Sequence, residues 1–257
     1  MPFERVSQEK LSIGIARQIE DLILRGILRP GQRLPSEREL SERMEVSRPS
    51  LREALADLQQ RGLLTARAGA GVYVADVLGS AFAPALIDLF ADHPIALFDT
   101  ISFRRDMEGL AAVRAVKHGT DTDLAVIDTI FKKMEAAHRK SDPTDEAQLD
   151  ADFHLAIIEA SHNIILLHMM RSMYDLLRQG VFYNRAVMFQ QRLTRGDLVG
   201  QHRAINVAIQ NRDAAAAQAA INAHLDYVQH ALEDQQTAIQ NEGFARKRLD
   251  IERQRVK

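Results

Sequence analysis

The sequence predicts a mainly α-helical chain of two domains: a small N-terminal one that ends in a two-stranded hairpin, and a larger bundle built of helices alone. Composition is the first reason, since 46% of the 257 residues are hydrophobic, only 5% are aromatic and Trp is absent. Chains rich in Ala, Leu and Ile favour helices. The second reason is that apolar residues recur at helical spacing through most of the chain, whereas strand-like runs occur only before residue 76.

Length and composition also exclude several classes of protein. A chain of 257 residues is too long for one small core and fits two domains better. No apolar run approaches the roughly 20 residues that span a bilayer, and the N-terminus lacks the apolar core of a signal peptide. The absence of Cys excludes disulfides and thiolate metal sites. We therefore expect a soluble, cytoplasmic protein that does not contact membranes.

The first predicted helix follows a short segment without periodicity, residues 1–9. Its apolar stripe consists of Leu11, Ile15, Ile19, Leu22 and Ile23. The helix should end near Arg25 and Gly26, and a turn at residues 29–31 leads to the next one. This helix would supply one wall of a small core.

Two short helices joined by a tight turn come next. Ser36 stands three residues before Glu39, the spacing of a capping box, which predicts that a helix begins there. Residues 44–46 interrupt the pattern, and Ser47 then offers a second N-cap, with Pro49 in the first turn. These features are typical of a helix-turn-helix.

The second of these helices presents two different faces. The positions with the spacing of a buried stripe are Leu51, Ala54, Leu55 and Leu58. Arg48 and Arg52 are four residues apart and lie on another face. Arginines near the start of a second helix are placed to enter a major groove of DNA.

A β-hairpin, or wing, is predicted after this helix. Residues 63–67 and 71–75 have strand character and are separated by a Gly-containing tip, residues 68–70. Arg67 at this tip could contact a phosphate or enter a minor groove. Residues 1–75 hold 12 Lys and Arg against 10 Asp and Glu, and 11 of the 12 are Arg. The excess is small, but Arg makes bidentate contacts to phosphate and guanine.

The remaining chain is predicted to be a helical bundle. Residues 76–84, which include Gly, Ser and Pro, would link it to the N-terminal domain of residues 1–75. Helices are expected at residues 85–90, 99–117, 123–139, 146–161, 164–183, 197–211 and 214–240. On the second of them Leu110 is expected to be buried. The bundle domain should cover residues 85–240, and a charged tail, residues 241–257, should fray.

Four side chains of the bundle have the chemistry of a metal site. Asp150 and His154 are four residues apart on one helix, and His202 and His224 lie beside apolar residues on two later helices. One carboxylate and three imidazoles would bind Zn2+, Ni2+ or Mn2+ and leave positions open for a small carboxylate.

Two alternatives to this metal site remain open at the level of spacing. A histidine on an apolar helix face is often a core residue that donates a hydrogen bond to a carbonyl. His162 and His168 are also rival ligands, and periodicity does not show which histidines converge.

The N-terminal domain contains motifs that resemble a known family. They are Gly31-x-x-Leu-Pro-Ser-Glu-Arg-Glu-Leu, Val46-Ser-Arg-Pro-Ser-Leu-Arg-Glu-Ala-Leu, Gly62-Leu-Leu and Arg67-Ala-Gly-Ala-Gly-Val-Tyr-Val. These motifs resemble the winged-helix DNA-binding domain of GntR-type bacterial transcription regulators. The resemblance implies contacts to double-stranded DNA through Arg38, Arg48 and Arg52, phosphate contacts through Ser47 and Ser50, and a close approach of the wing to the minor groove at Gly69.

The helical part resembles the effector domain, called FCD, of the FadR-like branch of this family. The matching motifs include Phe103-Arg-Arg-Asp-Met-Glu, Asp150-Ala-Asp-Phe-His, Gln201-His202 and Ala223-His-Leu225. The resemblance implies a divalent metal, with Zn2+ first and Ni2+ or Mn2+ as alternatives. It assigns the metal ligands to Asp150, His154, His202 and His224.

The same resemblance implies a ligand pocket next to the metal. Arg104 would anchor the ligand, and Asn163 would line the pocket. Arg105 is a rival for this role, but successive helix residues point about 100° apart, so only one of the two arginines can face inward. The alternative for Arg104 is a surface ion pair with Glu108, four residues further on.

The overall pattern resembles regulators of pyruvate, lactate or glycolate metabolism. This resemblance implies a homodimeric repressor that binds a palindromic operator and responds to a small organic acid. Two alternatives belong to other classes: a metal-dependent hydrolase or lyase that carries a DNA-binding head, and an architectural DNA protein without an effector. Neither the acid, the operator nor the direction of the response follows from the sequence.

Overall fold

The computed structural model describes residues 11–76, 83–140, 143–178 and 192–255. The segment predicted to lack periodicity, most of the predicted linker, and the end of the helix predicted at residues 164–183 lie outside these ranges. The chain divides into two compact units, Met1–Ala81 and Phe82–Lys257, and each is described by itself. None of the described helices is long and apolar enough to cross a membrane.

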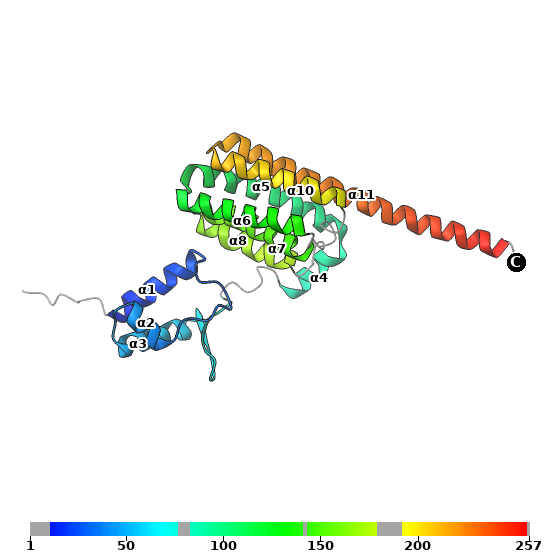
Figure 1. The fold of residues 1–257 in the computed structure, drawn as a ribbon. Coiled ribbons are helices and arrows are strands. Elements are labelled where there is room, and N and C mark those ends of the chain that lie inside the picture. The colour runs from blue at the N-terminus through cyan, green and yellow to red at the C-terminus, as the bar shows by residue number, and fades with distance from the viewer. Residues whose placement is uncertain (1–10, 77–82, 141–142, 179–191, 256–257) are drawn as a thin grey trace, which may run out of the picture. The chain divides into compact units, whose positions relative to one another are not determined.

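Within residues 11–76, the N-terminal unit contains three helices and a two-stranded sheet (Figure 1). The elements are α1 (Leu11–Leu24), α2 (Glu37–Arg43), α3 (Arg48–Gln60), β1 (Leu64–Arg67) and β2 (Gly71–Val74). The predicted helix-turn-helix and wing are therefore confirmed. The strands are antiparallel and pair from Leu64 with Val74 to Arg67 with Gly71.

Serine side chains begin both helices of the helix-turn-helix, as predicted. The Oγ of Ser36 accepts a hydrogen bond from the backbone N of Glu39 at 3.3 Å, and the Oγ of Ser47 accepts one from the N of Ser50 at 3.3 Å. The carboxylate of Glu39 forms an ion pair with Arg43 at 2.6 Å. These hydrogen bonds satisfy backbone N–H groups in the first turns of α2 and α3 and so define where each helix begins.

The core of this unit lies between α1, α3 and the hairpin. The buried residues that were predicted on α3, Leu51, Ala54, Leu55 and Leu58, are all in it. On α1, Ile15, Ile19 and Ile23 are buried, but Leu11 is 54% exposed, so its predicted burial is wrong. Leu11 is the first residue of the helix and lies a full turn before Ile15, at the edge of the core.

The described part of the C-terminal unit is all helical. Its described helices are α4 (Pro84–Asp92), α5 (Pro94–His118), α6 (Asp121–Lys140), α7 (Pro143–Ala160), α8 (Ile164–Arg178), α10 (Arg192–Gln210) and α11 (Ala214–Arg255). Each of them corresponds to a predicted helix, but α5 and α10 begin five residues earlier than the predicted starts at 99 and 197. Pro94 lies in the first turn of α5, where proline is tolerated.

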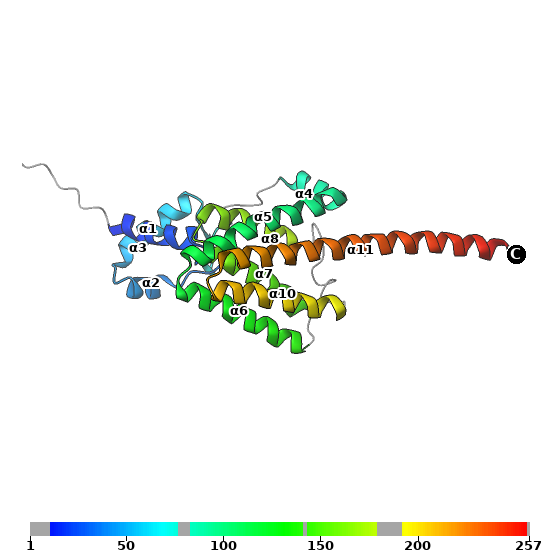
Figure 2. The same ribbon diagram turned by 90° about the horizontal axis from the view of Figure 1, so that it is seen from above.

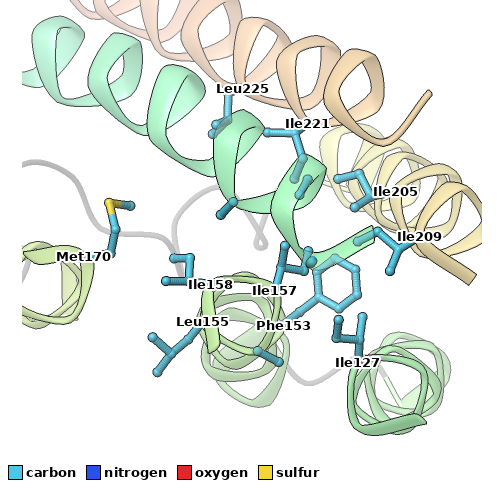
Figure 3. Close-up of a cluster of buried hydrophobic side chains, with 14 of the residues drawn as sticks. Ile127, Phe153, Leu155, Ile157, Ile158, Met170, Ile205, Ile209, Ile221 and Leu225 are labelled. Carbon is cyan, nitrogen blue, oxygen red and sulfur yellow. The ribbon is translucent and has the colours of Figure 1, made fainter. Parts of the chain in front are cut away.

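Helix α5 lies in the middle of this bundle. It packs against α7 and α11, while α10 packs against α6 and α11, and α8 packs against α7 (Figures 1 and 2). Buried side chains from these helices form one continuous core, of which Phe153, Ile157, Ile205 and Ile221 are part (Figure 3). Side chains from α7, α10 and α11 thus meet in one interior.

The predicted burial of Leu110 is wrong, because this side chain is 46% exposed. The interior face of α5 carries Ala111, Ala112 and Ala115 instead, all fully buried. Small side chains on a packed face let neighbouring helices approach closely. Alanines therefore form the inward face of α5, and alanine predicts burial less strongly than leucine does.

The C-terminal tail, residues 241–257, was predicted to fray, but α11 continues without a break to Arg255. Figures 1 and 2 show its C-terminal part extending beyond the other helices of the bundle. Ile239, Phe244 and Leu249 are each more than half exposed there. The segment contains no proline, and Arg246 pairs with Glu242 one turn away at 2.8 Å, which favours continued helix.

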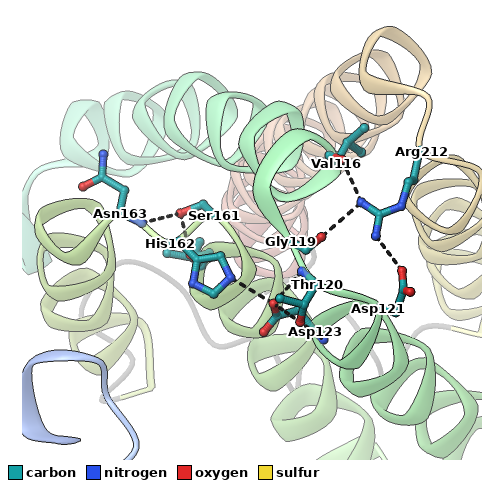
Figure 4. A network of polar contacts seen from close by, with 10 residues as sticks. Val116, Gly119, Thr120, Asp121, Asp123, Ser161, His162, Asn163 and Arg212 are labelled. Carbon is teal, nitrogen blue, oxygen red and sulfur yellow. Dashed lines mark hydrogen bonds and ion pairs between the residues drawn. The ribbon is translucent and has the colours of Figure 1, made fainter. Parts of the chain in front are cut away.

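A polar network joins three inter-helix turns at one end of the bundle (Figure 4). The guanidinium of Arg212 donates to the carbonyl oxygens of Val116 and Gly119, at 3.1 and 3.0 Å, and pairs with Asp121 at 2.8 Å. His162 lies 2.9 Å from the carboxylate of Asp123. The carbonyls at the end of α5 are thereby satisfied by a cation, the arrangement that a helix C-terminus prefers.

We expect opposite effects from adding one methyl group at two glycines. In Gly119→Ala the new Cβ would collide with the carbonyl oxygen of Ala115 and would contact Leu124, so stability should fall by about 1–3 kcal/mol. Gly200→Ala lies inside α10 with no atom within 4 Å of the new Cβ, and should raise stability by about 0.5–1 kcal/mol. Urea unfolding measures both, and equal effects would contradict the packing described for Gly119.

Candidate functional site

Three helices bring the four predicted metal ligands together in the bundle interior. Asp150 and His154 come from α7, His202 from α10 and His224 from α11. Each offers one ligand atom, and these atoms all lie within 4.8 Å of one another. The four residues, called here the cation cluster, are between 0% and 5% exposed.

The two rival histidines lie elsewhere. His162 is exposed and contacts Asp123 in the turn network. His168 is half-buried on α8, and neither belongs to the cation cluster. Of the histidines left open by spacing, the structure therefore brings His154, His202 and His224 to one place.

The distances within the cation cluster fit a shared ion. Nε2 of His202 lies 3.0 Å from Oδ1 of Asp150 and 3.2 Å from Nε2 of His154, and Nε2 of His154 lies 3.7 Å from the same carboxylate oxygen. Ligand atoms about 2.1 Å from one ion are roughly 3.0 Å apart at right angles and about 3.4 Å apart in a tetrahedron. A divalent cation therefore fits the donor set and its spacing.

Two further residues contact the Nδ1 atoms of His154 and His224. Nδ1 of His154 lies 2.7 Å from Oε2 of Glu108, and Nδ1 of His224 lies 2.9 Å from Oε1 of Gln201. An acceptor at Nδ1 favours the tautomer that keeps the proton there and leaves Nε2 as a lone pair. The sequence interpretation gave neither Glu108 nor Gln201 a role at this site.

The imidazoles of His154 and His224 favour the neutral form that binds metals. Burial lowers the pKa of His154, although the carboxylate of Glu108 opposes this effect. Burial also lowers the pKa of His224 well below its usual value, and the neighbouring His202 and His154 add to the shift. At neutral pH these two side chains are therefore uncharged, and they would not have to lose a positive charge before binding a cation.

Arg104 is buried beside the cation cluster. It is 1% exposed, and its Nε donates to Oε1 of Glu108 at 2.7 Å. Its Nη2 donates to the hydroxyl of Tyr174 at 3.2 Å, and that hydroxyl donates to Oε1 of Glu108 at 2.6 Å. Burial alone would raise the pKa of the Glu108 carboxyl, but the Arg104 guanidinium beside it lowers this pKa well below its usual range.

The ion pair between Arg104 and Glu108 exists, as the alternative interpretation held, but it is buried rather than on the surface. Arg105, the rival, has a side chain that is 36% exposed and pairs with Asp226 at 2.7 Å. Only one of the two adjacent arginines points inward, as helix geometry requires.

Asn163 lies at the start of α8, and its predicted place in a ligand pocket stays a prediction. It is the N-cap of α8, where its Oδ1 accepts a hydrogen bond from the backbone N of Leu166 at 3.1 Å. The half-buried side chain lies in the turn after α7, near His162 (Figure 4). Its amide oxygen therefore accepts a backbone hydrogen bond at the start of α8. An Asn directly before a helical stripe is itself a sequence signal for a cap.

The predicted DNA contacts lie on the surface of the N-terminal unit. Ser50 is half-buried, and the exposed ones are Arg38, Ser47, Arg48, Arg52, Arg67 and Gly69. Arg52 pairs with Glu37 at 2.6 Å and Arg38 pairs with Glu42 at 3.2 Å. Ion pairs this exposed are weak and can be exchanged for contacts to phosphates or bases.

The wing presents a cation at its end. The Arg67 guanidinium carbon lies 4.3 Å from the centroid of the Tyr73 ring, a cation–π distance. Gly69 at the tip has a φ of 70°, a conformation that favours glycine. A positive group next to a tip whose central residue, Gly69, has no side chain suits an approach to a DNA backbone.

Two family models match the chain. The model described as "Bacterial regulatory proteins, gntR family" matches residues 11–74, and the "FCD domain" model matches residues 99–227. The first covers the three N-terminal helices and the wing. The second covers all four residues of the cation cluster together with Arg104 and Glu108.

Several curated proteins are similar over most of the chain. The Glc operon transcriptional activator of Escherichia coli is 36% identical over 86% of this chain and 88% of its own length. A regulatory protein of the same organism, named for the L-lactate dehydrogenase operon, is 37% identical over 87% of this chain and 86% of its length. The regulator LutR of Bacillus subtilis is 30% identical over 82% of this chain and 96% of its length.

A solved structure supports the fold. The structure titled "Streptococcus agalactiae GntR" aligns with 85% of this chain and 99% of its own, with a TM-score of 0.52 and 24% sequence identity. At this identity the likeness concerns the fold alone.

Metal uptake by the cation cluster gives a direct measurement. Adding Zn2+ or Ni2+ to chelator-treated protein should raise the melting temperature, because a ligand at 100 times its Kd stabilises the folded state by about 2.7 kcal/mol. His202→Ala should remove this metal-induced increase. His230→Ala, which removes an exposed histidine further along α11, should keep it. The same increase in the His202 variant as in the unmodified protein would rule out the cluster as the binding site.

Proposed function

Because this chain belongs to the GntR family of bacterial DNA-binding transcription regulators and carries an FCD domain, we propose that it is a homodimeric repressor controlled by a small carboxylate and a divalent metal. The observation that carries this proposal is the cation cluster, buried within one bundle and flanked by Arg104. The named relatives are transcription regulators, so the alternative of a hydrolase or lyase is not supported. The site of action is the bacterial cytoplasm, where the DNA lies.

The N-terminal unit supplies DNA recognition. In this proposal Arg48 and Arg52 near the start of α3 read bases in the major groove, and the serines that cap this helix contact phosphates. Arg67 and Gly69 bring the wing to the minor groove. A two-fold dimer would place two copies of α3 on one duplex, so the operator should be a short palindrome.

The FCD domain supplies sensing. Asp150, His154, His202 and His224 would hold the cation, with Zn2+ the first candidate and Ni2+ or Mn2+ next, because three nitrogens and one oxygen suit these ions. The bound cation would supply a Lewis-acid centre that holds a carboxylate oxygen. Arg104 would bind the carboxylate on its other side. The relative that is named for the L-lactate dehydrogenase operon suggests the chemical class of the effector, and we propose a small organic acid such as lactate.

Binding of the acid would change the affinity for DNA because the metal site is buried. The four cluster residues are at most 5% exposed, and a described cavity of about 470 Å³ between α4 and α5 contains none of them. In this proposal, binding of the acid shifts the helices that enclose the cation. A shift that the DNA-bound state disfavours would weaken DNA binding, typically by about 1–3 kcal/mol.

Arginine substitutions test the DNA half of this proposal. Duplexes selected by the wild-type protein from a random pool serve as the probe. Arg52→Ala should bind them about 10- to 100-fold more weakly, because one bidentate contact to a base contributes about 1–3 kcal/mol. Arg61→Ala, at the other end of α3, is the control and should bind as the wild type does. Equal affinity of the Arg52 variant for the selected duplexes would contradict the assignment.

An acid titration tests the sensing half and the direction of regulation. With Zn2+ present, lactate should lower the affinity for the selected duplex about 5- to 150-fold, the range of typical coupling energies. A chelator should remove this response. A lactate-induced increase in affinity would overturn the repressor assignment, and no response to lactate, pyruvate, glycolate or citrate would overturn the effector site.

A further inference from the structure

One carboxylate joins the two halves of the sensing site. Oε1 of Glu108 accepts hydrogen bonds from Nε of Arg104 at 2.7 Å and from the hydroxyl of Tyr174 at 2.6 Å. Oε2 of the same carboxylate lies 2.7 Å from Nδ1 of His154. Glu108 is 1% exposed, so water does not compete for either oxygen. The metal ligand and the anion-binding arginine therefore share one negatively charged neighbour.

This neighbour determines how His154 faces the cation cluster. A carboxylate next to Nδ1 favours the tautomer with the proton on that nitrogen. Nε2 then carries the lone pair, and this is the atom that lies 3.2 Å from Nε2 of His202 and 3.7 Å from Oδ1 of Asp150. Carboxylates behind a ligating imidazole fix its orientation and raise its basicity, and their loss typically weakens metal binding about 10- to 100-fold.

The same neighbour also determines the charge of the site. The two carboxylates of Asp150 and Glu108 and the one guanidinium of Arg104 give a net charge of −1. A divalent cation changes this charge to +1. Burying a net charge is costly, so the best-compensated occupant is an anion with one negative charge. A second carboxylate would leave one buried negative charge without compensation.

We propose that Glu108 is a positioning residue that orients His154 toward the cation and neutralises Arg104, so that the loaded site selects acids with a single carboxylate. This inference rests on the proposed function, because it names the charge of the acid and the residue that sets it. Without Glu108 the guanidinium would stand uncompensated, and the loaded site would carry a charge of +2, which suits a dicarboxylate.

Metal affinity without any acid tests the positioning role. In competition with a chromophoric chelator, Glu108→Gln should bind Zn2+ about 10- to 100-fold more weakly than the wild type. Glu146→Gln is the matched control, because Glu146 is also buried and paired with an arginine, Arg195, but is not part of the cation cluster. It should keep wild-type affinity. Equal affinity in the Glu108 variant would overturn the positioning role.

Acid selectivity tests the charge. Lactate and malate are the matched probes, since malate carries one more carboxylate on a similar hydroxy acid. Calorimetry on Zn2+-loaded wild type should show lactate binding at least tenfold more tightly than malate, and Glu108→Gln should lose or reverse this preference. Malate binding as tightly as lactate in the wild type, or an unchanged preference in the variant, would overturn the proposal.

A second variant separates charge from position and guards against misfolding of the first. Glu108→Asp keeps the charge but is one methylene shorter, so it should weaken Zn2+ binding and still prefer lactate. If Glu108→Gln does not fold, this variant decides, and unchanged Zn2+ affinity in it overturns the positioning role. A wild-type protein that takes up no Zn2+ would reject the proposed function itself, whereas Zn2+ uptake that ignores Glu108 rejects only the inference.

Discussion

The C-terminal unit buries several ionisable groups, and its structure depends on how these groups are compensated. A carboxylate, three imidazoles, a guanidinium and a second carboxylate lie in the interior of one bundle, and none of them is more than 5% exposed. Such groups are tolerated only when each has a partner. Glu108 compensates Arg104, and oxygen atoms of Glu108 and Gln201 lie within 3 Å of Nδ1 of His154 and His224. What remains is a set of donor atoms directed at one point, which a cation would complete.

Much of the fold could be predicted because its signals are local. Serine caps at Ser36 and Ser47 and apolar stripes depend on a few neighbouring residues, and the structure confirms them. The misplaced features depend on longer-range packing. Leu110 lies outside the core because alanines let α5 approach its neighbours, and no local rule ranks Ala above Leu. The unbroken α11 was missed because a charged segment resembles a disordered tail unless its i, i+4 pairs are counted.

The residues of the metal site could be predicted from the sequence, but the contacts that they make could not. Spacing placed Asp150 and His154 on one face and offered His202 and His224 as partners, and the family resemblance selected these two over His162 and His168. Glu108 was considered only as a surface partner of Arg104, because a sequence does not show whether an i, i+4 ion pair faces water or a neighbouring imidazole. Asn163 has a local role that the family resemblance did not indicate, because its amide oxygen caps a helix.

The length of α11 has a mechanical consequence. His224 lies near the start of this helix and Arg255 ends it, 31 residues further on, a distance of about 47 Å along the axis. A straight helix behaves as a stiff rod over such a length, so tilting it by about 5° at His224 would move the far end by roughly 4 Å. Any tilt of α11 within the bundle would therefore displace its exposed C-terminal end further than the part that packs against α5 and α10.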